Sequence, residues 1–231
     1  MSDFFRFPRT PHITWLGEGS PRDDKQLSLQ EAEAMLAGEV VIEEKLDGAN
    51  LGISLNSDGQ LRAQNRGQYL ITPFTGQFSR LQGWLSRHNY KLADKLESNL
   101  ILFGEWCTAR HSLDYDKLPD WFLLFDVYDR AESRFWSTIR RNGLANELGL
   151  TTVPQLIHGQ VTLSKLQSLL EMQSQFRAGP LEGVVIRREN ADWCLERAKL
   201  VRAEFTQAIS EHWRSRTIEW NQIQMPRMGA L

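Results

Sequence analysis

The sequence has little cysteine and no long apolar run. Its two cysteines, Cys107 and Cys194, form no Cys-x-x-Cys pair, so neither a disulfide framework nor a zinc site is indicated. No stretch reaches the roughly 18 apolar residues that a membrane span needs. The first residues also lack the apolar core of a secretory signal. These absences predict a cytoplasmic protein with no membrane partner.

The sequence also lacks a strong charge of either sign. Lys and Arg total 27 against 29 Asp and Glu, so no overall basic field indicates a nucleic-acid-binding protein. Such a site would have to be a local basic patch, and Arg140-Arg141 and Arg187-Arg188 are candidates unless they are ordinary solvated charges. The eight tryptophans indicate a thick aromatic core or, alternatively, platforms on which bases stack.

The apolar pattern predicts strands and helices that do not alternate regularly. Strands are expected at 40–45, 50–55, 61–65, 100–106, 121–128, 184–188 and 193–202. Helices are expected at 28–38, which opens on a capping box, at 76–98 in two pieces, at 138–148 and at 162–173. No glycine-rich phosphate loop follows a strand. The mixture predicts an α+β fold with antiparallel sheets rather than a doubly wound nucleotide fold.

The tail has a different pattern. Phe205, Ile209, Trp213 and Trp220 recur near helical spacing, with charged residues on the other face. We therefore predict a domain over residues 1–202 and, within 203–231, an amphipathic C-terminal helix that packs on it. A helix that binds a partner is the alternative.

A lysine at the end of an expected strand gives the first sign of chemistry. Lys45 is followed by Leu46-Asp47-Gly48, and a Lys-x-Asp-Gly string of this kind arises by chance in about one such chain in twenty. The plain interpretation is a solvated lysine before a turn. The sharper one is a nucleophile whose amine is deprotonated by burial or nearby positive charge. Such an amine can attack the α-phosphate of a nucleoside triphosphate.

Further polar and aromatic groups follow Lys45 at expected strand ends. In order, they are Asn65-Arg66-Gly67, Glu105, Phe125-Asp126, Glu182-Gly183 and Lys199. Each has an ordinary alternative, as a core aromatic, a turn or a solvated charge. The ordered set resembles the covalent nucleotidyltransferases, which comprise ATP-dependent RNA and DNA ligases and capping enzymes. It is most similar to the RNA ligase branch, and stretches 9–12 and 104–119 resemble bacterial members of that branch.

This resemblance implies an adenylation domain whose antiparallel sheets form a nucleotide cleft. It also implies roles around the lysine. Lys45 would carry AMP, Glu44 would lie beside the adenine, and Asp47 would orient the lysine and its metal. Asn50 would act in the sealing steps.

Roles follow for the later residues as well. Arg66 would contact the ribose or phosphates, Glu105 the ribose hydroxyls and Phe125 the adenine, with Asp126 supporting the site. Glu182, together with Asp47, would hold Mg²⁺ or Mn²⁺. Lys199 would grip the α-phosphate of ATP and lower the pKa of Lys45.

The sequence departs from the family pattern in two places. The last motif often has two lysines one residue apart, but here Val201 takes the second position, with Arg202 next to it. Either Arg202 substitutes by a different reach or one phosphate contact is missing. The stretch after Arg202 is too short for an OB fold, so we expect the C-terminal helix or an accessory, end-healing partner to grip the nucleic acid. His12 lies in a family-like stretch without an assigned role.

These features predict an ATP-dependent RNA ligase that joins a 3′-hydroxyl to a 5′-phosphate through lysyl-AMP and an adenylated 5′ end, in RNA repair. RNA ends are the favoured substrate. The alternatives are a DNA ligase, a GTP-using capping-type enzyme, and a non-sealing nucleic-acid-binding module. A module without chemistry would be expected to have lost Lys45 or Glu182, and both are present.

Overall fold

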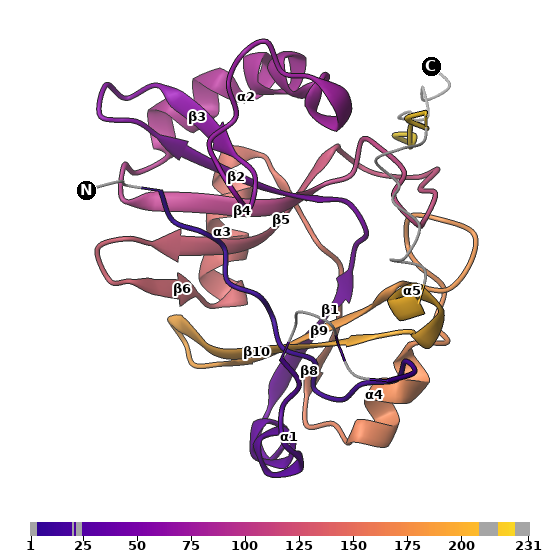
Figure 1. Ribbon diagram of the computed structural model, residues 1–231. Coiled ribbons are helices and arrows are strands. Elements are labelled where there is room, and N and C mark those ends of the chain that lie inside the picture. Colours follow the sequence, from indigo (N-terminus) through magenta and orange to yellow (C-terminus); the bar gives the residue numbers. More distant parts are fainter. Residues whose placement is uncertain (1–3, 20, 22–24, 208–216, 225–231) are drawn as a thin grey trace, which may run out of the picture.

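One large sheet forms the framework of the computed structural model, which describes residues 4–19, 21, 25–207 and 217–224. Ten strands join in the order β3-β2-β4-β5-β6-β10-β9-β1-β8, with β7 beside β5 (Figure 1). The pairs along this path are antiparallel, and only β7 runs parallel to its neighbour. The strands are β1 (Val40–Lys45), β2 (Ala49–Leu55), β3 (Leu61–Gln64), β4 (Leu100–Trp106), β5 (Phe122–Asp129), β6 (Arg134–Trp136), β7 (Thr151–Thr152), β8 (Gln155–Gly159), β9 (Gly183–Glu189) and β10 (Trp193–Val201).

Short helices cover the two halves of this sheet. They are α1 (Leu29–Leu36), the 3-10 turn η1 (Gly76–Phe78), α2 (Leu81–Lys95), α3 (Thr138–Leu148), α4 (Leu163–Leu169) and α5 (Ala203–Gln207). In the described part of the chain, none of them is long and apolar enough to cross a bilayer.

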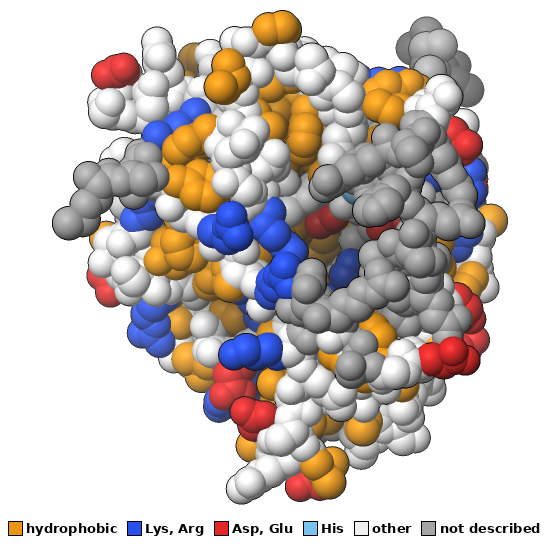
Figure 2. Space-filling view, in the orientation of Figure 1, with side chains coloured by type: hydrophobic (Ala, Val, Ile, Leu, Met, Phe, Trp, Pro, Cys, Tyr) orange, Lys and Arg blue, Asp and Glu red, His pale blue; other side chains and the backbone are white. Residues whose placement is uncertain are grey.

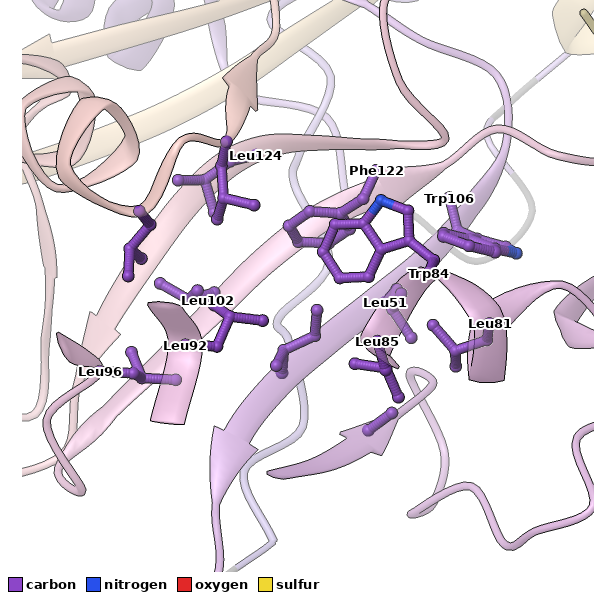
Figure 3. Close-up of a cluster of buried hydrophobic side chains, with 14 of the residues drawn as sticks. Leu51, Leu81, Trp84, Leu85, Leu92, Leu96, Leu102, Trp106, Phe122 and Leu124 are labelled. Atoms are coloured by element: carbon purple, nitrogen blue, oxygen red, sulfur yellow. The ribbon is translucent and has the colours of Figure 1, made fainter. Parts of the chain in front are cut away.

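The larger core lies between α2, α3 and the strands β2, β4 and β5. Trp84 of α2 is fully buried and packs at a tilt on Phe122, with ring centroids 5.3 Å apart, and edge-on to Trp106 (Figure 3). The Trp84 indole also donates to Asp120, which satisfies its buried N–H. Trp84 and Trp106, two of the eight tryptophans, are thus core residues rather than stacking platforms.

A second core lies under the other half of the sheet. The strand residues that do not point into this core are the ones that can take part in chemistry. Ile42 of β1, Ile186 of β9 and Leu200 of β10 pack there against α1 and α4. Because side chains alternate along a strand, the neighbouring positions point to the opposite face. Lys45 and Lys199 lie on that opposite face.

The sequence predicted most of these elements. The capping box of α1 forms, with Ser28 accepting from the Glu31 amide and Glu31 from the Ser28 amide. The expected helix over 76–98 is in two pieces, η1 and α2. Three short strands, β6, β7 and β8, were not predicted, and α4 is shorter than the expected 162–173 helix. The predicted antiparallel sheets are one continuous sheet.

The predicted C-terminal helix is wrong at its far end. A helix begins at Ala203, and Phe205 packs against a buried cluster of the domain. Residues 208–216, which include Ile209 and Trp213, lie outside the described residues. Trp220 is extended, because it pairs with Ala109 in a short β-bridge.

Candidate active site

A cavity of about 900 Å³ opens between the two halves of the sheet. Figure 2 shows acidic and basic side chains inside a recess on this face, with Lys and Arg side chains at its rim. Seven of the residues singled out from the sequence as nucleotide or catalytic groups line it: Glu44, Lys45, Asn50, Arg66, Glu105, Phe125 and Lys199. Their strands are distant in sequence, so the fold brings them together.

Lys45, the last residue of β1, makes an ion pair inside this cavity. Its Nζ lies 2.7 and 2.8 Å from the two carboxylate oxygens of Glu182, which precedes β9. Burial by itself would lower the pKa of Lys45, but the charges of Glu182 and Glu105 outweigh burial and raise it. In the nucleotide-free protein these carboxylates therefore favour the ammonium form of Lys45. That Lys199 lowers this pKa when nucleotide and metal are bound stays a prediction.

For the two carboxyl groups beside Lys45, burial outweighs the neighbouring charge. Burial, the largest influence, raises the pKa of both Glu105 and Glu182 to about 7, although the charge of Lys45 partly offsets it. Glu105 on β4 accepts a hydrogen bond of 2.9 Å from the Gly48 amide. Only glycine fits there, because a Cβ would lie 2.7 Å from the Trp106 carbonyl oxygen. The turn after Lys45 is thus pressed against β4.

Asp47 faces a loop rather than the cavity. Its Oδ2 accepts from the amides of Ser112 and Leu113, at 2.6 and 2.9 Å, and its own amide donates to the Tyr115 hydroxyl. Within the described residues, no group of three or more His, Cys, Asp or Glu side chains is arranged to hold a metal ion. A metal at this site would need oxygen atoms from the substrate in addition to those of the protein.

Glu44 and Asn50 present polar groups on the cavity wall. Glu44 accepts from the Ser174 hydroxyl at 2.5 Å, and burial raises its pKa despite that bond. The Asn50 side-chain oxygen is buried and has no hydrogen-bond partner among the described residues. A buried acceptor without a donor is costly, so a substrate donor is the natural partner for it.

The cations of β10 differ from the prediction. Arg197 and Lys199 both line the cavity, because residues two apart on a strand share a face. Val201 is buried, and Arg202 lies outside the cavity, where it donates to the Leu170 carbonyl at 2.7 Å and pairs with Glu204. Arg197, two positions before Lys199 rather than after it, is the residue that sequence reasoning missed.

Arg197 is held firmly in place. It forms an ion pair with Asp126 of β5, and its guanidinium lies 4.7 and 4.1 Å from the ring centres of Phe7 and Phe135. The sequence did carry a signal for Arg197: it lies two residues before Lys199 in a predicted strand, and residues two apart on a strand share a face.

One arginine of each basic pair that was considered as a nucleic-acid contact is buried in the protein. Arg141 and Arg187 are both fully buried, so the idea that they track a nucleic-acid backbone is wrong for them. Arg141 binds both oxygens of Glu43, and Arg187 pairs with Asp126. Both guanidiniums also donate to the carbonyl of Phe125, at 2.7 and 3.3 Å. They fix the residue whose ring lines the cavity.

The antiparallel sheet and its lysine-bearing cavity define a nucleotidyltransferase-type domain. The chain belongs to the RNA ligase family, whose model matches residues 38–201. The fold resembles that of a Naegleria gruberi RNA ligase. A variant with ATP and Mn has a TM-score of 0.67 at 17% identity over 90% of this chain and 59% of that chain.

Other structures of the same ligase agree. A variant with AMP and Mn gives a TM-score of 0.64 at 18% identity, covering 88% of this chain and 64% of that one. An apo variant gives 0.63 at 15% identity, covering 90% and 58%. The present chain thus spans less than two thirds of the length of these structures. No curated protein matches the chain.

Proposed function

We propose that the protein is an ATP-dependent RNA ligase that forms lysyl-AMP at Lys45. The observation that carries the proposal is the position of Lys45, in ion-pair contact with Glu182 inside a cavity whose wall also bears Arg197 and Lys199. Family membership and the Naegleria structures with ATP, AMP and Mn support the choice of ATP.

The first step is nucleotide transfer to the lysine. The Lys45 ammonium first releases a proton to solvent. The neutral amine then attacks the α-phosphorus of ATP, so that a P–N bond forms as the bond from the α-phosphorus to the bridging oxygen breaks and pyrophosphate leaves. Lys199 and Arg197 are placed to neutralise charge on the phosphates. We propose that Phe125 stacks on the adenine, with Glu44 beside it, and that Glu105 binds the ribose hydroxyls.

The next two steps transfer AMP to an RNA 5′-phosphate and then seal the strand. A 3′-hydroxyl attacks the adenylated end, forms the phosphodiester bond and releases AMP. We propose that Arg66, exposed at the cavity rim, binds the 5′-phosphate. The unpartnered oxygen of Asn50 would accept a hydrogen bond from a substrate hydroxyl in these steps.

A divalent metal fits this site when substrate oxygens complete its ligand set. Glu182 already holds a cation, the Lys45 ammonium, on both carboxylate oxygens. Mg²⁺ at nucleotide sites is commonly held by one or two carboxylates plus phosphates, so Glu182 is the residue we propose to hold it, with Asp47 nearby. Bound Mg²⁺ or Mn²⁺ would neutralise phosphate charge. A role in RNA repair, and an end-healing or accessory partner, remain predictions.

Intact mass after incubation with ATP and Mg²⁺ tests the first step. We expect a gain of about 329 Da, one AMP on the lysine, in the wild type and none in Lys45→Ala or in Lys45→Arg, which keeps the ion pair with Glu182. A folded wild-type protein that starts free of AMP and gains no mass would contradict the proposal. GTP in place of ATP, and nicked DNA in place of RNA, then separate the ligase proposed here from a capping-type enzyme and a DNA ligase.

A further inference from the structure

The loop between β4 and β5 holds the turn that follows the candidate nucleophile. Its inner side supplies the Ser112 and Leu113 amides to the carboxylate of Asp47, and the buried Tyr115 places its hydroxyl 2.9 Å from the Asp47 amide. His111 of the same loop lines the cavity. Any shift of this loop therefore moves groups within two residues of Lys45.

The outer side of the loop is fixed by a second segment, residues 217–224, which we call the C-terminal segment. It pairs with the loop through bridges between Ala109 and Trp220 and between Leu118 and Ile223. Backbone hydrogen bonds of 2.8–3.1 Å continue this pairing. The segment lies beyond residues 38–201, the part that the family model matches.

Asn221 is the centre of this contact. It is only 4% exposed. The side-chain nitrogen Nδ2 donates to the carbonyls of Cys107 and Ala109, at 2.9 and 3.2 Å. The side-chain oxygen Oδ1 accepts from the backbone amide of Tyr115 at 2.9 Å. One side chain thus satisfies three backbone groups of a single loop, on both sides of the residues that hold Asp47. Removing it would leave buried backbone groups unpaired, which the loop can relieve only by moving.

We propose that Asn221 is a positioning residue for the lysine chemistry, acting through Tyr115 and the loop on Asp47. The C-terminal segment then completes an active site whose reacting groups all lie in the family core. The inference rests on the proposed function for its kinetic part, because a misplaced turn matters only if Lys45 reacts. Its structural part, that Asn221 keeps the loop in place, stands apart from any activity.

The structural part is tested by amide hydrogen exchange of the intact chain. In Asn221→Ala, we expect the peptide that contains Ser112 and Leu113 to exchange at least about tenfold faster, as a local opening predicts, while peptides of α2 stay at the wild-type rate. Gln222→Ala is the matched control, because its exposed side chain can be removed without loss of the backbone bonds. Unchanged exchange in Asn221→Ala, or equal changes in both variants, would overturn the proposal whether or not the protein is a ligase.

The kinetic part uses lysyl-AMP formation and a double-mutant cycle. Small misplacements of reacting groups cost up to about 10²-fold in rate, so we expect Asn221→Ala to lower the rate constant at saturating ATP by about ten- to a hundredfold with KM for ATP nearly unchanged. In a Tyr115→Phe background the same change should cost far less, since both act along one path. Losses that simply multiply, or a loss confined to KM, would overturn the positioning role.

If Asn221→Ala does not fold, Asn221→Asp keeps the acceptor for the Tyr115 amide and removes the two donated bonds. The same results are expected from it. A wild-type protein that forms no lysyl-AMP contradicts the proposed function, but the exchange experiment still decides whether Asn221 holds the loop.

Discussion

At the scale of single residues, the candidate nucleophile Lys45 is protonated in the nucleotide-free protein and is therefore unreactive. The carboxylates of Glu182 and Glu105 hold Lys45 as an ammonium, although a nucleophilic amine must be neutral. Arg197 and Lys199, the cations of β10 that line the cavity, do not reverse this in the nucleotide-free protein. Because the pKa values of Glu105 and Glu182 are about 7, the net charge of the site changes with pH near neutrality.

We expect Glu105 to make the nucleotide-free protein less stable as the pH rises. Its pKa is about 7 in the folded chain, above the ordinary value of 4.5, so its contribution to stability is full below pH 4.5 and is lost as the pH rises through about 7. Between about pH 5 and pH 8 the thermal midpoint of the wild type should fall by about 3–8 °C more than that of Glu105→Gln.

Two features make this comparison clean. Glutamine keeps an acceptor for the Gly48 amide but cannot ionise. Lys45, whose pKa is raised, contributes stability that is present below its ordinary pKa of 10.5, so it does not titrate in this window. Parallel pH curves for the two proteins would show that Glu105 is not the group responsible.

The two arginines near Lys199 give opposite predictions. Arg197 lines the cavity, whereas Arg202 binds the Leu170 carbonyl and Glu204 outside it. Loss of a hydrogen bond to a charged group costs about 1.5–3 kcal/mol, so Arg197→Gln should slow lysyl-AMP formation about ten- to a hundredfold. Arg202→Gln should leave the rate within about twofold. A larger loss in Arg202→Gln than in Arg197→Gln would restore the sequence-based assignment.

At the scale of elements, the β9–β10 hairpin places Glu182 and the cations of the cavity. Gly183 starts β9, pairs with both Lys45 and Val201, and leaves no room for a Cβ, which would lie 2.3 Å from the Leu200 carbonyl oxygen. Because the clash is with backbone, Gly183→Ala must open the hairpin beside Glu182. We expect a loss of about 3 kcal/mol in the free energy of unfolding.

Gly143 is the control for that prediction. It lies inside α3, where an added Cβ would meet nothing within 4 Å. Gly143→Ala should therefore raise the free energy of unfolding by about 0.5–1 kcal/mol, through helix propensity alone. Urea titration of both variants measures the difference, and a Gly183→Ala protein as stable as the wild type would argue against a closely packed hairpin.

The same hairpin shows what the sequence could and could not predict. Both strands were predicted from the sequence. Lys45, Glu105 and Lys199 were chosen as candidate site residues because the ordered set of motifs that contains them resembles the covalent nucleotidyltransferases. The burial of Arg141 and Arg187 was not predictable, since it depends on carboxylates distant in sequence. Arg202 was considered as a substitute for the family's second lysine because it lies next to that position, and Arg197 was not considered. Alternation of side chains along β10, not proximity in sequence, decides which of them shares a face with Lys199.

At the scale of the whole molecule, a buried ionic network joins the two halves of the sheet. Arg187 of β9 lies 2.8 Å from Asp126 of β5 and 2.6 Å from Glu189, and Arg141 of α3 binds Glu43 of β1 at 2.6 Å. These side chains lie beside the cavity, between the two apolar cores. The relative position of Lys45 and Phe125 therefore depends on charges that water does not reach.

Removing one member of this network should destabilise the whole domain. Arg187→Leu leaves Asp126 and Glu189 buried with one cation fewer, and breaking a buried pair in this way costs about 3–5 kcal/mol. Its neighbour Arg188 is 37% exposed and pairs with Glu196 at the surface, so Arg188→Gln should change the free energy of unfolding by no more than about 0.5 kcal/mol. Urea denaturation of the two variants makes the comparison at adjacent positions. Equal, small effects would mean that the network is not what holds the two halves of the sheet around the cavity.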